Sequence, residues 1–248
     1  MSSRLSHEIK AEALRLGFSA CGIARAEPVD EATAAAFREW LQSGGHATMQ
    51  YMENYEDKRL DPRLLMPGVK SIISVALNYT PETPVKGFAN YAIGKDYHDI
   101  VKQKLHQLAQ ILAPLQLPPK GGEPQTANQK ASPIGGGREG ASFNGALCLS
   151  YLTIENRGDI PEEAAQKMGE TFYGCDRCQQ VCPWNAKAKP TAEPLLQPTS
   201  ELLSMKDEDW QQLSVEQYRK LFKGSAVKRA KYEGLMRNIK AIRNEQDK

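Results

Sequence analysis

Three of the five cysteines in this 248-residue chain lie close together, and their spacing limits what the surrounding segment can form. They are Cys175, Cys178 and Cys182, with Pro183 directly after the last of them, and Cys148 lies upstream. An odd number of cysteines with such a dense cluster fits metal ligation in a reducing compartment better than a set of disulfides. The sequence therefore predicts a metal site built from four thiols.

The spacing Cys-x2-Cys-x3-Cys-Pro matches the end of the bacterial ferredoxin run that binds [4Fe–4S] clusters. In that run neighbouring thiolates converge on one cluster, whereas the cysteine before proline ligates a second cluster. Cys148 would then supply the remaining nearby ligand. Two alternatives stay open, because four thiolates also suit tetrahedral zinc and cysteines also serve as small buried residues. We favour iron–sulfur because the final Cys-Pro is typical of ferredoxins, and we expect Cys21, inside an apolar run, to be a core residue.

Length and composition predict an ordinary globular protein. At 27.5 kDa, with 40% apolar and 25% charged residues, the chain can form one large core or two small ones. The formal net charge of +2 is too small to require a polyanionic partner by itself. The N-terminus lacks an apolar segment of signal-peptide length, and no stretch approaches the roughly 20 apolar residues of a membrane span. We therefore expect a cytoplasmic protein without a membrane partner.

The chain up to residue 117 has the mixed pattern of a compact α/β or α+β domain. Apolar residues at helical spacing predict a helix from Leu5 to Leu16, which Gly17 ends. A β-branched run from Val69 to Leu77 has the length of a buried strand. The other expected elements are a strand over 20–24, helices over 33–41 and 49–55, and a helix that begins near Asp96.

The next segment, from Pro118 to Ala146, has almost no large apolar residue and no periodicity. Such a stretch cannot bury enough surface to offset the entropy lost on ordering it, so we predict a disordered linker. Structure is expected to resume at Leu147, followed by a helix that starts near Pro161. The cysteine cluster comes after that helix.

The C-terminal tail is helical by composition from Ser200 to Ile242, and one part of it is strongly basic. Against the single acid Glu233, this part carries Arg219, Lys220, Lys223, Lys228, Arg229, Lys231, Arg237, Lys240 and Arg243. Lysine-rich helix faces are often only solvated, whereas a local excess of cations also suits contact with phosphate groups. The pattern leaves both interpretations open.

An acid, a phenol and an imidazole come together at Asp96, Tyr97 and His98, where a helix is expected to begin. The simplest role of Asp96 is to cap that helix, because an aspartate in this position accepts bonds from backbone N–H groups. A catalytic role for the three residues is the alternative. We expect the cap.

Four segments of the chain resemble the epoxyqueuosine reductase family and occur in the family's order: NYAIGKDYHDIVKQKL, CLSYLTIENRGDIPEE, FYGCDRCQQVCPWN and GSAVKRAKYEGLMRNI. The resemblance extends over nearly everything outside 118–146. It implies a cobalamin-dependent oxidoreductase with two [4Fe–4S] clusters that reduces epoxyqueuosine to queuosine in tRNA. It also implies an α+β fold with a nitroreductase-like and cobalamin-processing-like N-terminal domain, a partial ferredoxin-like module, and the start of a HEAT-like helical region.

The family's functional residues can be transferred only where its motifs match this sequence. By the resemblance, Asn54 lies where the family contacts cobalamin. Ser150 and Asp176 lie where residues near the corrin and the second cluster are expected. Lys228 and Arg229 match a segment expected near the tRNA.

The resemblance divides the cysteines between two clusters. Cys148, Cys175 and Cys178 match three ligands of the second cluster, and Cys182 matches the far ligand of the first. The family's aspartate general acid, a glycine-rich segment against cobalamin and the complete first cysteine run are all missing, and residues 118–146 stand in their place. We interpret this as a frameshift or internal deletion, which predicts an inactive or impaired enzyme. The only substitute proton donors it suggests are Asp96, Tyr97 and His98.

Residue patterns and the resemblance together divide the chain into four ranges: a cobalamin-binding-like domain over 1–117, the linker over 118–146, a partial iron–sulfur module over 147–190 and a basic helical tail over 191–248. Two other functions stay open, a non-catalytic cobalamin- or RNA-binding remnant and an electron carrier with a single cluster. We expect a monomer whose partner is tRNA, and the sequence does not identify an electron donor.

Overall fold

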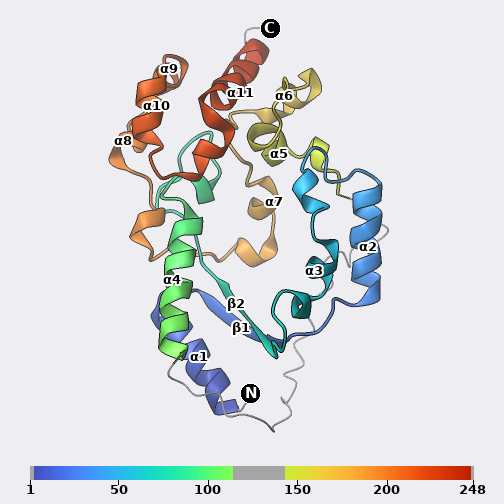
Figure 1. Ribbon diagram of the computed structural model, residues 1–248. Coiled ribbons are helices and arrows are strands. Elements are labelled where there is room, and N and C mark those ends of the chain that lie inside the picture. Colours follow the sequence, from blue (N-terminus) through green and yellow to red (C-terminus); the bar gives the residue numbers. More distant parts are fainter. Residues whose placement is uncertain (1–2, 114–142, 247–248) are drawn as a thin grey trace. The chain divides into compact units, whose positions relative to one another are not determined.

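The computed structural model describes residues 3–113 and 143–246, and the chain divides into two compact units (Figure 1). One unit combines residues 1–77 with 104–145, and the other combines 78–103 with 146–248. Helix α4 (Tyr97–Leu112) begins in the second unit and ends in the first. Residues 78–103, which the sequence pattern grouped with the part of the chain before them, thus cluster with the C-terminal half.

The first unit contains a two-stranded antiparallel sheet, which holds the only strands in the described residues. Strand β1 (Ala20–Arg25) pairs with β2 (Ser71–Ala76), so that Ala20 lies opposite Ala76 and Arg25 opposite Ser71. Its helices are α1 (Ser3–Arg15), α2 (Glu31–Gln42) and α3 (Glu56–Leu60), with 3-10 turns η1 (Gln50–Met52) and η2 (Pro62–Leu64). The helices expected near 5–16 and 33–41 are confirmed. The one expected over 49–55 is only the turn η1, followed by α3.

Helix α1 ends close to the predicted residue. Gly17 adopts a φ of +90°, which favours glycine and turns the chain out of the helix. Lys104 donates to the carbonyl of Leu16 at 2.8 Å, so a terminal acceptor of the helix is satisfied. Ile9 and Ala13 are buried on the inner face of α1, as its apolar spacing predicted.

The strand predicted over 69–77 exists as β2, but the prediction that it is buried was wrong. Half-buried and exposed residues alternate along β2, and Ile72 keeps 36% of its surface exposed. A continuous apolar run is typical of a strand covered on both faces, whereas alternation marks a strand covered on one. The sheet is also small, because β1 is the only strand that pairs with β2 in the described residues.

The end of the predicted linker is folded. Residues 118–142 lie outside the described residues, but Phe143 and Gly145 make defined contacts within the first unit. Trp40 donates from its indole nitrogen to the carbonyl of Phe143 at 2.7 Å, and the N–H of Gly145 donates to the carbonyl of Gly45 at 2.7 Å. A Cβ at position 145 would lie 2.8 Å from that carbonyl oxygen, so only glycine fits there. The linker prediction was therefore wrong for its last residues.

The second unit is helical. Its elements are η3 (Asn90–Ala92), α5 (Leu149–Ile154), α6 (Glu162–Met168), α7 (Arg177–Gln180), η5 (Pro183–Asn185), η6 (Pro194–Leu196), α8 (Ser200–Leu203), α9 (Asp207–Gln211), α10 (Val215–Leu221), η7 (Ala226–Ala230) and α11 (Lys231–Gln246). The 3-10 turn η4 (Gly145–Leu147) precedes α5. Helix α11 packs against α5, α6 and α9 (Figure 1). The helical tail is confirmed. Over the described ranges, no helix is both long and apolar enough to cross a membrane.

Aromatic side chains form the centre of the second unit. The ring of Phe88 lies 5.1 Å from that of Trp210, 5.6 Å from Phe222 and 5.9 Å from Phe172, measured between centroids. Phe88 also pairs through its backbone with Tyr173 in an isolated parallel bridge. Aromatic contacts of this kind contribute stability beyond the area they bury. They explain why residues 78–103 belong with the C-terminal half of the chain.

A matched pair of leucines tests this core. Leu235 of α11 is fully buried, whereas Leu203 of α8 is 45% exposed. We expect Leu235→Ala to lower the free energy of unfolding by about 2–5 kcal/mol, because it removes buried methyl groups and leaves a cavity. Leu203→Ala should lower it by less than about 1 kcal/mol. Equal losses in guanidinium unfolding would contradict this assignment of the core.

Candidate functional site

The four clustered cysteines all belong to the second unit. Cys148 directly precedes α5, Cys175 lies two residues before α7, Cys178 lies within α7 and Cys182 directly precedes η5. All four are free thiols; Cys178 is exposed and the other three are half-buried. Cys21 is also free and half-buried, in β1 of the first unit, where burial raises the pKa of its thiol. Thiol chemistry is therefore present at each predicted ligand.

A tight turn positions the start of the cysteine run. Gly174 adopts a φ of +69°, and a Cβ there would lie 2.6 Å from the Cβ of Ala89, so the turn requires glycine. Its buried N–H donates to the hydroxyl of Thr153 at 3.0 Å. Asp176, at the start of α7, accepts from the N–H of Asn90 at 2.7 Å. Residues on both sides of Cys175 are thus held by hydrogen bonds to other segments.

A buried amide connects the two segments that carry cysteines. Asn238 of α11 is fully buried, and its Nδ2 donates to the carbonyls of Thr153 and Phe172, both at 2.8 Å. Its Oδ1 accepts from the guanidinium of Arg237 at 2.8 Å. Thr153 follows Cys148 along α5, and Phe172 precedes Cys175. Because every polar atom of the amide has a partner, this contact fixes α5 relative to the segment before α7.

The structure does not gather the predicted ligand set. Among the described residues, which include all five cysteines, no three histidine, cysteine, aspartate or glutamate side chains lie where they could hold a metal ion together. The donor chemistry fits an iron–sulfur cluster, since the thiols are free, but their placement does not form one complete site. The assignment of Cys148, Cys175, Cys178 and Cys182 as ligands therefore stays a prediction.

The three residues expected near a cofactor do not share one unit. Ser150 in α5 and Asp176 before α7 are half-buried in the second unit, whereas Asn54 is exposed in the first. Burial raises the pKa of the Asp176 carboxyl, and the hydrogen bond from the Asn90 N–H opposes this shift. The backbone carbonyl of Asn54 accepts from Arg59 at 3.0 Å, which holds the turn before α3.

The acid, phenol and imidazole at the start of α4 form a helix cap. One oxygen of Asp96 accepts from the backbone N–H of His98 at 3.0 Å and lies 2.8 Å from its Nδ1. The ring of Tyr97 stacks on that of His98, with 4.1 Å between centroids. Burial raises the pKa of Tyr97, and the charge of Asp96 raises it further, so this phenol is a poor proton donor. The prediction of a cap is confirmed.

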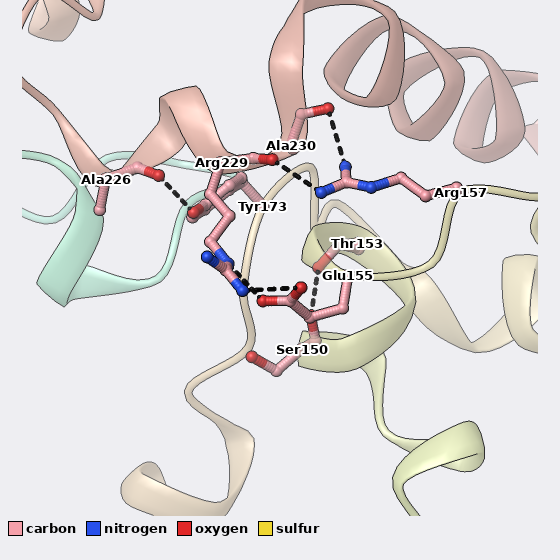
Figure 2. A network of polar contacts seen from close by, with 8 residues as sticks. All are labelled: Ser150, Thr153, Glu155, Arg157, Tyr173, Ala226, Arg229 and Ala230. Atoms are coloured by element: carbon pink, nitrogen blue, oxygen red, sulfur yellow. Dashed lines mark hydrogen bonds and ion pairs between the residues drawn. The ribbon is translucent and has the colours of Figure 1, made fainter. Parts of the chain in front are cut away.

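The two residues expected near RNA lie on η7 and differ in their surroundings. Lys228 is exposed. Arg229 forms a bidentate ion pair with Glu155, which lies just after α5, at 2.5 and 3.1 Å (Figure 2). Other basic side chains of the tail are also engaged, because Lys220 pairs with Glu201 at 2.8 Å and Arg237 donates to backbone carbonyls. Some of the basic side chains of the tail are therefore already paired with other groups of the protein.

Sequence reasoning missed three residues of this region: Thr153, Glu155 and Asn238. Each acts on a segment far away in the chain, so no local pattern revealed it. The available signal was a polar residue inside an apolar stretch, such as Thr153 in Leu149–Ile154 and Asn238 beside Ile239. A polar side chain in such a place is expected to be buried with a hydrogen-bond partner.

Comparisons with known proteins agree with one another. A family model described as "Epoxyqueuosine reductase QueG, DUF1730" matches residues 59–125, and a second, described as "4Fe-4S double cluster binding domain", matches residues 133–185. A protein of Cellulophaga algicola named epoxyqueuosine reductase is 36% identical over 96% of this chain and 99% of its own length. One of the same name from Leadbetterella byssophila is 34% identical over 96% and 98%.

Solved structures share the fold. The structure of an epoxyqueuosine reductase from Streptococcus thermophilus superposes with a TM-score of 0.76 over all of this chain and 82% of its own, at 19% identity. A crystal structure of epoxyqueuosine reductase with an epoxyqueuosine-modified tRNA-Tyr stem loop gives a TM-score of 0.75 over 96% of this chain and 80% of its own, also at 19% identity. The expected mixed α+β fold, rich in helices, is confirmed at this level.

Two asparagines test the buried amide. Asn238→Ala would leave the carbonyls of Thr153 and Phe172 buried without donors, so we expect a loss of about 2–5 kcal/mol in the free energy of unfolding. Asn185 makes two similar amide hydrogen bonds, but it is exposed. Asn185→Ala should lose less than about 1 kcal/mol, because water replaces its bonds. Urea unfolding measures both, and similar losses would refute the role of Asn238.

Two thiols test the environment of Cys21. In chelator-treated protein at pH 8, we expect iodoacetamide to label Cys21 more slowly than the exposed Cys178, because burial limits access and a raised pKa reduces the thiolate fraction. Peptide mass spectrometry over time measures both rates. Cys21→Ala should remove the labelled peptide that contains residue 21 and leave the labelling rate of Cys178 unchanged. Equal labelling rates would show that β1 does not shield this thiol.

Proposed function

The chain belongs to the epoxyqueuosine reductase family, and from this premise we propose that its reaction is the reduction of epoxyqueuosine to queuosine in tRNA. The observation that carries the proposal is the identity of 36% over 96% of this chain and 99% of the relative from Cellulophaga algicola. The 4Fe-4S double-cluster model matched over 133–185 agrees with an oxidoreductase that uses iron–sulfur chemistry. The related enzyme solved with a modified tRNA stem loop supports tRNA as the partner.

We further propose that an internal segment of the family is missing from this chain. The alignment with the Cellulophaga relative runs over 304 positions, whereas 96% of 248 residues is about 238, so about 66 positions have no residue of this chain. This difference supports a deletion or frameshift, which we place at 118–146 because the resemblance leads us to expect the family's acid, glycine-rich segment and first cysteine run there. The ranges 1–117, 118–146, 147–190 and 191–248 remain our functional division, with nitroreductase-like and HEAT-like parts at the two ends.

The remaining residues are assigned roles on this basis. We propose Cys148, Cys175 and Cys178 as ligands of one [4Fe–4S] cluster and Cys182 as the only retained ligand of the other. Cobalamin, with Asn54, Ser150 and Asp176 as candidate contacts, would supply the reducing chemistry in a complete enzyme. Among the described residues, no three metal ligands come together, so the structure shows no complete site for these groups.

The three candidate proton donors of this chain are poorly suited to that role. Asp96 caps α4 and lies against His98, whose side chain is 71% exposed, and Tyr97 holds its proton more tightly than a free phenol. None of these residues is an effective replacement for a general acid positioned at the epoxide. We therefore propose an impaired reductase that retains tRNA contact through Lys228 and Arg229, as a monomer in the cytoplasm.

Turnover of RNA containing epoxyqueuosine tests the proposal. We expect anaerobically reconstituted protein to form queuosine at least about a hundredfold more slowly than the Cellulophaga relative, because a positioned acid contributes about 10²–10⁴ in rate. A chimera in which the relative's segment replaces 118–146 should recover much of that rate. Wild-type turnover close to that of the relative, measured by nucleoside mass spectrometry, would refute the impairment. No turnover by the chimera would refute the assigned reaction.

A further inference from the structure

Arg229, which we propose as an RNA contact, forms an ion pair with Glu155. The Glu155 side chain is only 19% exposed, whereas that of Arg229 is 56% exposed. Two nitrogens of the Arg229 guanidinium donate to the carboxylate, with Nε–Oε1 at 2.5 Å and Nη2–Oε2 at 3.1 Å (Figure 2). A bidentate pair of this kind is the geometry in which arginine also binds phosphate. The carboxylate and a phosphate would therefore compete for the same donors.

The backbone of η7 is held by other contacts. Arg157 donates to the carbonyl of Arg229 at 3.1 Å and to that of Ala230 at 3.5 Å (Figure 2). The hydroxyl of Tyr173 donates to the carbonyl of Ala226 at 2.6 Å, and that of Ser225 donates to the carbonyl of Ala92 at 2.9 Å. The η7 segment thus has anchors that do not involve Glu155.

Glu155 consequently controls the side chain of Arg229 more than the path of its backbone. Val227 and Ala230 are buried on the inner side of η7, while Lys228 and Arg229 point to the exposed side. Loss of the carboxylate would remove this bidentate partner from a guanidinium next to an exposed lysine. Two adjacent cations on a fixed turn suit a phosphate of a nucleic-acid backbone.

We propose that Glu155 competes with RNA phosphates for Arg229 and so weakens RNA binding by this protein. RNA would bind by displacing the carboxylate from the guanidinium. This inference rests on the proposed RNA contact at Lys228 and Arg229. It adds a residue, Glu155, that sets the affinity of that contact.

The experiment measures binding of an RNA stem-loop with the tRNA-Tyr anticodon arm sequence by fluorescence anisotropy at several salt concentrations. We expect Glu155→Gln to tighten binding about three- to fivefold, the range of one exposed ion pair. The salt dependence should steepen by less than about 1 in its log–log slope, because no carboxylate is freed to take up a cation when the phosphate binds Arg229. Arg229→Ala should weaken binding, and the double variant should bind like Arg229→Ala alone.

Matched variants separate this effect from a change in net charge or stability. Glu170 pairs with Lys86 at 2.8 Å elsewhere in the second unit, so Glu170→Gln removes the same charge without touching η7. We expect it to tighten binding less than Glu155→Gln does. Glu155→Asp shortens the carboxylate but keeps its charge, and it should give a smaller gain in the same direction. It also keeps the test valid if Glu155→Gln does not fold.

Several outcomes would overturn the inference. If Arg229→Ala weakens binding but Glu155→Gln and Glu155→Asp leave it unchanged or weaken it, Glu155 only supports the structure and the competition fails. If neither Lys228→Ala nor Arg229→Ala changes binding, the proposed RNA contact fails and the competition fails with it. If Glu155→Gln still tightens binding in the Arg229→Ala background, its effect does not pass through Arg229.

Discussion

The second unit depends on one buried amide, that of Asn238. It donates to carbonyls on two segments that are not adjacent in the chain, and Arg237 satisfies its oxygen. A buried amide is costly unless all of its hydrogen bonds are made, and here they are made. The α11 helix therefore does more than cover the core, since it fixes α5 against the segment that leads to Cys175. Thr153 completes this connection by accepting the N–H of Gly174.

These hydrogen bonds form a framework that orders the segments carrying the cysteines. The described cysteine side chains nevertheless do not come together as a metal site. The contacts that hold this framework involve residues 149–174 and α11, which lie outside the range 118–146. The segment that we propose to be missing at 118–146 would therefore leave these hydrogen bonds in place. The chain shares the fold of the solved epoxyqueuosine reductase from Streptococcus thermophilus, with a TM-score of 0.76, and a shared fold does not by itself establish the chemistry.

Local patterns predicted the helices well. The apolar spacing from Leu5 to Leu16 and the aspartate at position 96 gave two helices and a cap that the structure confirms. Local patterns could not predict contacts between residues that lie far apart in the chain. The burial of Val69–Leu77 depended on how many strands join the sheet, and the order at Gly145 depended on Gly45. The basic tail predicted a cationic surface, but the partner of Arg229 lies 74 residues away, and only the fold brings it there.

The iron and acid-labile sulfide content of anaerobically reconstituted protein tests the central claim most directly. Three ligands for one cluster and a single ligand for the other predict no more than about four iron atoms per chain. A stable content of about eight iron and eight sulfide per chain, the content of two [4Fe–4S] clusters, would contradict the claim that this chain lacks the first cluster.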